Sequence, residues 1–441
     1  MKSDLSFKQL NNLALPALLS GVAEPLLSLT DTAIIGNIDQ NATEALAAVG
    51  IVGTFISMLI WVFGQSRSAL SSIISQYLGG KKLEEVKELP SQAIFIIVLI
   101  SLLIILITYP LSNEIFKLYN AKNLILEFCN HYFKIRILGL PFTLFTIGIF
   151  GVFRGLQNTF IPMIVAVLGT SLNIILDFVL IYGISDLIEP MHIKGAATAS
   201  VISQFFMAVL ALIFLKRKTG IPLKPVFPFN KEMKTFIQMI INLFIRTIAL
   251  NVALFLGSTY ATKYGNASIA AYTIAINIWF LGAFLIDGYS SAGNILSGKF
   301  YGAKAYDMLI KLSNKLILCG ISVGLIIMII GFIFYKLTGQ IFTNEKEVLS
   351  NFYSVFWIVL IMQPFCAIAF IFDGVFKGLG QVKFLRNLLL ISTFIVFVPL
   401  LLVMDYFDMK LYAIFWALFF WVVARGIPLV INFRRQFLAM V

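Results

Sequence analysis

The sequence has little charge and almost no histidine or cysteine. Asp, Glu, Lys and Arg make up 12% of the 441 residues, and there are two His and three Cys, whereas a soluble domain carries roughly 25% charged residues. So few charges argue against a soluble globular or disordered chain. Cys129, Cys319 and Cys366 lie in or beside apolar segments without CxxC spacing, so neither a metal or redox centre nor a disulfide scaffold is predicted.

Motifs of enzymes and of nucleotide-driven pumps are also absent. The sequence has no GxxxxGK[ST] loop and no HExxH motif, and no nucleophile lies in a recognisable pattern with a base. We therefore predict that the protein is not an enzyme and needs no cofactor. A net charge of +12 would suggest a nucleic-acid partner for a soluble protein. In a membrane protein, basic cytoplasmic loops explain it, and no nucleic acid is expected.

Hydrophobic residues are abundant and gather in long runs. They make up 60% of the chain, and a transmembrane helix needs about 20 of them in succession. We predict an all-α integral membrane protein with twelve transmembrane helices, embedded in a lipid bilayer. Their approximate bounds are residues 10–36, 46–78, 90–111, 124–153, 160–184, 194–216, 234–262, 268–300, 310–335, 348–376, 384–404 and 411–433.

The distribution of basic residues predicts the orientation. An even number of spans places both termini on one side, and the loops of that side carry Lys and Arg in a ratio of about three to one over the other side. We predict that both termini are cytoplasmic. The high content of Ile, Lys, Asn and Phe is typical of an AT-rich genome, so we expect a bacterial inner membrane. The basic stretch Lys216 to Lys234 is predicted to join an N-lobe, residues 1–220, to a C-lobe, residues 221–441.

The two halves of the sequence repeat at a constant offset of 223 residues. Ser68 aligns with Ser291, Gly79 with Gly302 and Lys81 with Lys304, and the motif at residues 151–153 recurs at 374–376. Since one repeat holds six spans, the two lobes are parallel and related by a pseudo-two-fold axis along the membrane normal. Folds of this kind bind substrate near the midplane and alternate access by rocking the lobes.

Acidic residues within the predicted spans are the first candidates for function, because charge at membrane depth is costly. Asp31 lies late in the first span, and Glu24, seven residues earlier, shares its helix face. Pro16 permits this helix to bend. An acid on a bendable helix is a candidate switch. The alternative is that Asp31 caps a helix near the membrane interface.

Asn173 and Asp177 form a second candidate. They are four residues apart and therefore share a face of the fifth span. Their oxygens could hold a proton or Na⁺, both of which prefer oxygen; a pair that only fixes helix packing is the alternative. Asp287 and Asp373, in the second half, align with Gly64 and Phe150. The fold repeats but the acids do not, which indicates that the lobes divide the labour between ion coupling and substrate contact or gating.

Arginines within predicted spans are a further group of candidates. We expect Arg67, Arg136 and Arg246 to pair with acids or with helix C-terminal carbonyls, a structural role being favoured over substrate binding.

Five motifs together resemble the MATE (multidrug and toxic compound extrusion) transporters, in particular their DinF-like branch, over nearly the whole chain. They are Leu29 to Gly36, Phe153 to Thr159, Asn173 to Asp177, Ile286 to Tyr289 and Phe372 to Phe376. The resemblance implies two six-helix lobes and export of small cationic or amphipathic organic compounds, driven by entry of H⁺ or Na⁺.

The resemblance also implies the site. Its cation-coupling residues correspond to Asp31, Asn173, Asp177 and Ser200, with Asp31 and Asp177 as the candidate Na⁺ ligands and Pro16 as the bending point. Asp287 and Asp373 match motifs of the second half, whereas Ser291 to Asn294 depart from the Ala-Ala-Glu of many relatives. We expect a monomer. Alternatives on the same fold are a lipid-linked saccharide flippase, a polysaccharide exporter or an organic-acid exporter, of which the first two would require more cavity arginines.

Overall fold

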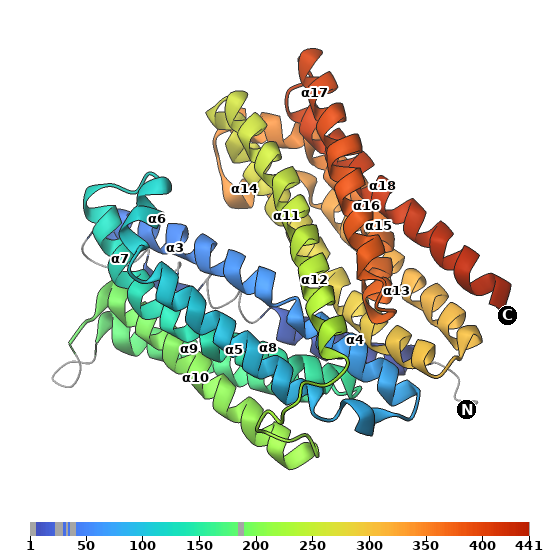
Figure 1. Cartoon of the computed structure of the whole chain (residues 1–441). Coiled ribbons are helices and arrows are strands. Elements are labelled where there is room, and N and C mark those ends of the chain that lie inside the picture. The colour runs from blue at the N-terminus through green and yellow to red at the C-terminus, as the bar shows by residue number, and fades with distance from the viewer. Residues whose placement is uncertain (1–5, 23–29, 32–33, 36–40, 184–188, 441) are drawn as a thin grey trace. The chain divides into compact units, whose positions relative to one another are not determined.

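The computed structural model describes residues 6–22, 30–31, 34–35, 41–183 and 189–440. In these residues the chain is α-helical, with short 3₁₀ segments and one π-helical turn (Figure 1). Eleven described helical segments are long and apolar enough to cross a membrane: Thr43–Gly79, Leu83–Thr108, Asn123–Gly155, Phe160–Tyr182, His192–Lys218, Met233–Lys263, Asn266–Gly302, Tyr306–Ile333, Lys346–Gly378, Val382–Tyr406 and Leu411–Met440. Each overlaps one predicted span, so the all-α membrane class is confirmed.

The first predicted span, residues 10–36, is described only in part. Helix α1, Phe7–Gly21, covers its beginning and contains Pro16. Residues 30–31 and 34–35 are helical. Residues 23–29, 32–33 and 36 of this span, which include Glu24, lie outside the described part of the chain.

The helices form two compact units. The N-terminal unit comprises Leu19–Ile74 and Lys82–Ile240, and the C-terminal unit comprises Met1–Leu18, Ser75–Lys81 and Ile241–Val441. The bodies of the units follow the two sequence halves, while two short N-terminal segments group with the second half. The lobe boundary between residues 220 and 221 stays a prediction.

In the N-terminal unit, α9 packs along α10, α5 packs on α8, and α3 packs on α7, as the blue and green ribbons of Figure 1 show. Its elements are α3 (Ala42–Phe63), the start of α4 (Ser66–Gly79), η1 (Leu83–Val86), α5 (Leu89–Thr108), α6 (Ser112–Leu118), α7 (Asn123–Arg136), η2 (Ile137–Gly139), α8 (Leu140–Gly155), α9 (Phe160–Tyr182) and α10 (His192–Lys218).

In the C-terminal unit, α15 is the central helix and contacts α12, α13 and α18. Its elements are α11 (Met233–Lys263), α12 (Asn266–Gly302), α13 (Tyr306–Ile333), α14 (Tyr335–Phe342), α15 (Lys346–Gly378), α16 (Val382–Ile391), the π-helical η3 (Ser392–Phe397), α17 (Val398–Tyr406), α18 (Leu411–Phe437) and η4 (Leu438–Met440). Large buried side chains such as Phe356, Phe372 and Trp421 fill its core.

The apolar residues outside the two cores remain exposed. On α5, Leu103, Leu106 and Ile107 are all more than half exposed. Such a surface is unfavourable in water and is stable where lipid tails cover it.

The backbone reproduces the sequence repeat at its turns. Lys81 and Lys304 are equivalent residues, and both adopt a left-handed conformation, with φ of 57° and 54°. Gln157 and Gly380 are a second equivalent pair with positive φ. Here the amide of Asn158 donates to the carbonyl of Phe153 at 2.9 Å, and that of Gln381 to Phe376 at 3.0 Å, so α8 and α15 end in the same hydrogen-bonded turn.

Equivalent residues also meet each other where α4 crosses α12. A Cβ on Gly79 would lie 1.9 Å from the carbonyl oxygen of Lys299, and one on Gly302 would lie 1.8 Å from that of Gln76. Gln76 and Lys299 are themselves equivalent, as are Gly79 and Gly302. The two contacts are therefore related by the repeat, and glycine is required at both because the helix backbones touch.

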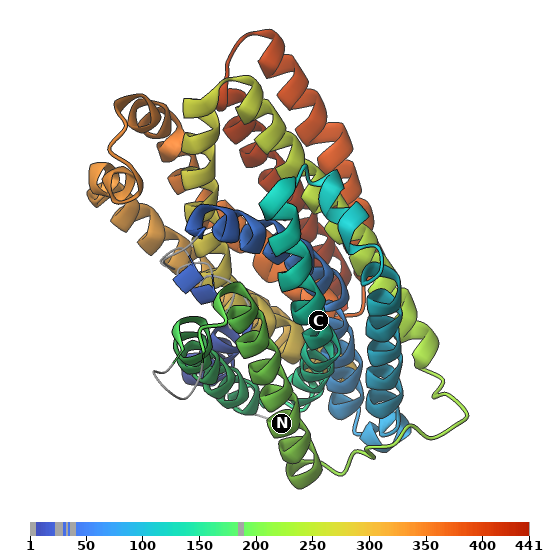
Figure 2. The ribbon, with the colours of Figure 1, turned by 90° about the vertical axis from the view of Figure 1, so that its left-hand side faces the viewer.

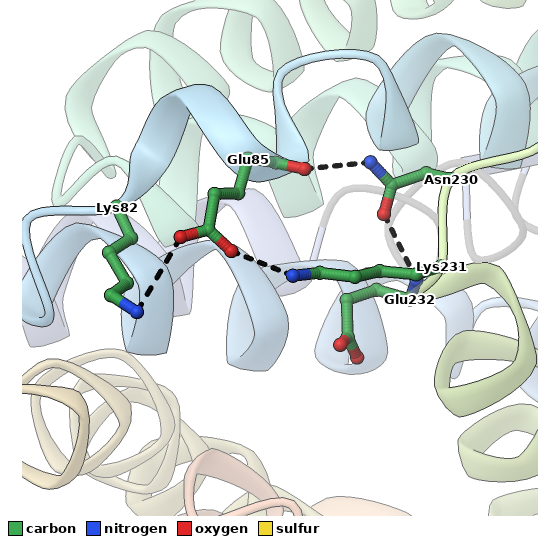
Figure 3. Close-up of polar contacts among 5 residues, drawn as sticks. All are labelled: Lys82, Glu85, Asn230, Lys231 and Glu232. Atoms are coloured by element: carbon green, nitrogen blue, oxygen red, sulfur yellow. Dashed lines mark hydrogen bonds and ion pairs between the residues drawn. The ribbon is translucent and has the colours of Figure 1, made fainter.

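The connection between α10 and α11, residues 219–232, forms a long loop along the lower edge of the ribbon in Figure 2. Polar contacts hold it on the N-terminal unit. Figure 3 shows the outer part: the Glu85 carboxylate pairs with Lys231 at 2.7 Å and Lys82 at 3.6 Å, and Asn230 Nδ2 donates to the Glu85 carbonyl at 2.8 Å. The Asn230 side chain also accepts from the amide of Glu232.

The buried side chain of Gln92 forms three hydrogen bonds with the same connection. Its side-chain amide donates to the carbonyls of Val226 and Pro228, and its oxygen accepts from the Asn230 amide at 2.8 Å. The basic linker predicted from the sequence is therefore bound to η1 and α5 by hydrogen bonds and an ion pair.

Replacing Gln92 by Ala should loosen this connection. It leaves partly buried backbone groups without their partner, which costs about 1–3 kcal/mol. We expect a lower melting temperature and faster proteolysis within residues 219–232. Lys82→Gln, which removes only an exposed ion pair, should change neither measurement. Equal cleavage of wild type and Gln92→Ala would show that Gln92 does not hold the segment.

Candidate functional site

The carboxyl group of Asp31 lies at the centre of a buried polar cluster in the N-terminal unit. Its Oδ2 atom accepts a hydrogen bond from the Tyr132 hydroxyl on α7 at 2.7 Å and another from the Ser200 hydroxyl on α10 at 3.0 Å. All three side chains are buried. Asp31 is therefore held by two helices that are remote from it in sequence, and a role as an interfacial helix cap does not fit this geometry.

Helix α9 supplies the second part of the cluster. Asn173 and Asp177 are fully buried one turn apart on it. Within the described residues, neither oxygen of Asp177 has a hydrogen-bond partner, and the same holds for both amide atoms of Asn173 and for Oδ1 of Asp31. A hydrogen bond between Asn173 and Asp177 that only fixes packing is thus not formed. The oxygens among these atoms are available to a small cation.

The charges of the cluster do not balance. The carboxylates of Asp31 and Asp177 interact electrostatically with each other and with Arg136, which is buried on α7 one turn after Tyr132. Among the described residues, two acids and one arginine leave one negative charge in a region of low dielectric, where uncompensated charge is costly. Binding of one monovalent cation neutralises the cluster.

The available ligands determine which cations fit. The unpartnered atoms that could ligate are the carboxyl and amide oxygens of Asp31, Asn173 and Asp177, the donor type that suits H⁺ or Na⁺. No group of three or more His, Cys, Asp or Glu side chains forms a metal cluster among the described residues. A transition-metal site has no support in that part of the chain.

The structure thus brings together three of the four predicted coupling residues, Asp31, Asp177 and Ser200, and places Asn173 one turn from Asp177. Tyr132 is a member that sequence reasoning did not single out. Its position four residues before Arg136, on the same helix face, was an available signal. Pro16 lies inside α1, and Glu24 lies outside the described residues.

The other predicted candidates lie elsewhere. Arg67 is half-buried on α4. Arg246 on α11 forms an ion pair with Asp373 on α15, in the C-terminal unit. Asp287 is exposed near the middle of α12. A charged side chain exposed at that depth faces a water-filled space in membrane proteins.

The fold and the repeat agree with a known transporter family. The MatE family profile matches residues 16–179 and 242–403, that is, one segment in each sequence repeat. The chain belongs to the MatE family. It is therefore a multi-pass membrane protein of a transporter family, and not an enzyme.

Individual relatives resemble this chain at low sequence identity. The chain is 25% identical to the DNA damage-inducible protein F of Escherichia coli over 87% of this chain and 83% of that protein. It is 30% identical to Protein DETOXIFICATION 42 of Arabidopsis thaliana over 56% of this chain, and the match spans about half (47%) of that relative's length.

A solved MatE structure has the same fold. A crystal structure of MATE in a bent conformation superposes with a TM-score of 0.90 and 20% identity, covering 98% of this chain and 95% of the other. The two-lobed, twelve-helix fold of the family is therefore the fold of this chain.

Proposed function

We propose that this protein exports small organic compounds by antiport against a cation bound at Asp31, Asn173, Asp177 and Ser200. The observation that carries the proposal is the buried pair of acids in the N-terminal unit, which holds one negative charge more than Arg136 compensates and several unpartnered oxygens. Such a group is stable when a cation occupies it, so binding and release of the cation change the energy of the N-terminal unit by several kcal/mol.

Antiport follows if the cation and the substrate favour different conformations. Entry of the cation relieves the repulsion between Asp31 and Asp177, and Tyr132 and Ser200 keep the Asp31 carboxyl group oriented. Substrate is then released outside, the cation-loaded transporter returns to face the cytoplasm, and the cation leaves there before the next substrate binds. Each elementary charge that enters supplies about 2.3 kcal/mol per 100 mV of membrane potential.

The cellular setting belongs to the same proposal. The excess of Lys and Arg in the loops on the side of the termini supports cytoplasmic termini, and the residue composition supports a bacterial inner membrane. We propose small amphipathic compounds as substrates and a monomer as the working unit.

Transport in proteoliposomes tests the proposal and identifies the coupling ion. Vesicles containing the protein and a cationic dye are placed under an imposed pH gradient, a Na⁺ gradient or neither. We expect one gradient to accelerate dye movement, and the effective gradient names the ion. Collapsing it with an ionophore should return the rate to that of empty vesicles. Equal dye movement in all three conditions would refute cation coupling.

A further inference from the structure

The C-terminal unit contains a buried group of charges with more cations than anions. It consists of Arg246 on α11, Asp373 and Lys377 on α15, and Arg425 on α18. Arg246, Asp373 and Arg425 are 7%, 6% and 3% exposed. Asp373 binds Arg246 through Oδ1 and the Lys377 ammonium through Oδ2 at 2.9 Å. Three cations and one acid leave a net charge of two positive units.

Within the part of the chain that the structure describes, no second acid balances this group. Besides Asp373, α11, α15 and α18 contain one acidic residue, Glu347, in the first turn of α15. Asp405 at the end of α17 is already bound to Lys263 and Tyr264. The charged or ionisable groups that act on Arg425 are Arg246, Asp373 and the Cys366 thiol. Asp287, on the packed helix α12, is exposed and not among them.

Arg425 is oriented without being neutralised. Its guanidinium group lies over the rings of Trp421 and Phe370, with 4.7 and 5.6 Å to the ring centroids. The Trp421 indole donates to the Thr393 hydroxyl at 3.0 Å, within the π-helical turn η3. Such turns are rare and often occur at functional sites. Nη1 of Arg425 has no hydrogen-bond partner in the described part of the chain.

A buried cation whose charge is not compensated is energetically costly, and an arginine whose guanidinium lies over aromatic rings keeps N–H donors that a carboxylate can accept from. We propose that Arg246, Lys377 and Arg425 form an anion site, and that the transported compounds include organic anions whose carboxylate groups bind there. This rests on the proposed transport function and names a substrate class for it. The side chain of Lys377 is 14% exposed, so a carboxylate would reach the group from the side of this ammonium.

Direct binding tests the site without any gradient. Purified full-length protein in neutral-lipid nanodiscs is titrated calorimetrically with succinate, a dianion that matches the two excess charges, and with its uncharged diamide. We expect succinate to bind and the diamide not to bind. Arg425→Gln should weaken succinate binding about tenfold or more, as expected for the loss of one charged hydrogen-bonding partner, and Arg425→Lys should weaken it less.

Asp373→Asn distinguishes a binding site from a structural ion cluster. A ligand carboxylate competes with Asp373 for Arg246 and Lys377, so removing this acid should tighten succinate binding. A purely structural cluster would lose stability and gain no affinity. Arg386→Gln is the matched control: Arg386 is exposed and bound only to Asn387, and its loss should leave succinate binding unchanged.

Three outcomes would overturn the proposal. They are no succinate binding to the wild type, equal binding by a folded Arg425→Gln variant, and displacement of succinate by phosphatidylglycerol in the nanodiscs, which would assign the site to a lipid phosphate. Succinate binding without gradient-driven transport would refute cation coupling alone, and gradient-driven transport without succinate binding would refute the anion site alone.

Discussion

Asp31→Asn is expected to abolish gradient-driven transport while leaving expression and folding close to those of the wild type. The amide keeps an oxygen that can accept from Tyr132 and Ser200, so the packing is retained. Loss of the charge removes the excess that attracts the cation. Deleting one partner of a buried charged interaction costs about 2–5 kcal/mol, which lowers cation affinity by a factor of about 30 to several thousand. The measurement is dye transport in proteoliposomes under the effective gradient.

Two sets of variants show whether the loss of transport comes from the loss of the Asp31 charge. Tyr132→Phe and Ser200→Ala remove one hydrogen bond each and no charge, so we expect a partial loss of transport, smaller than that of Asp31→Asn. Asp405→Asn is the matched control, because Asp405 also accepts from a tyrosine hydroxyl, that of Tyr264 at 2.7 Å. It lies outside the cluster, and its variant should transport normally. Full transport by Asp31→Asn would remove Asp31 from the coupling mechanism.

The spans and the repeat could be predicted because they depend on local sequence. Long apolar runs indicate transmembrane helices wherever they lie, and a constant offset of identities indicates a duplicated fold. The repeat does not determine every detail of the backbone, however. Pro141 begins α8 after a 3₁₀ turn, whereas its equivalent Pro364 lies inside the continuous helix α15. Equivalent prolines thus break one helix and are tolerated in the other.

The sites depend on which helices pack together, and periodicity does not contain that information. Spacing predicts that Asn173 and Asp177 share a face, but it cannot show that Tyr132 and Ser200 approach Asp31 from two other helices. Arg425 is a comparable case. In the sequence it is a basic residue of the predicted span 411–433, and only the packing of α18 shows that it is buried beside Trp421 and near Asp373.

Substitution of Gly79 or Gly302 is expected to cause a large loss of stability. A side chain on either residue would collide with the backbone of the opposing helix, since a Cβ would lie 1.9 Å from the Lys299 carbonyl oxygen or 1.8 Å from that of Gln76. Backbone atoms cannot move aside as the end of a flexible side chain can. Overpacking in a core costs about 1–3 kcal/mol or more, and Gly302→Leu should lower both the melting temperature and the yield of folded protein.

Because the two contacts are related by the repeat, the two glycines should respond alike. Gly79→Ala and Gly302→Ala are expected to destabilise the protein by similar amounts, and the double variant should be less destabilised than the sum, since the first substitution already separates α4 from α12. Gly50→Ala is the matched control: Gly50 lies inside α3 with open space around its Cβ position, so alanine should be neutral or slightly stabilising. Thermal unfolding in detergent measures all four variants. If Gly79→Ala and Gly302→Ala had the melting temperature of the wild type, the contact between α4 and α12 would not contribute to the stability of the fold.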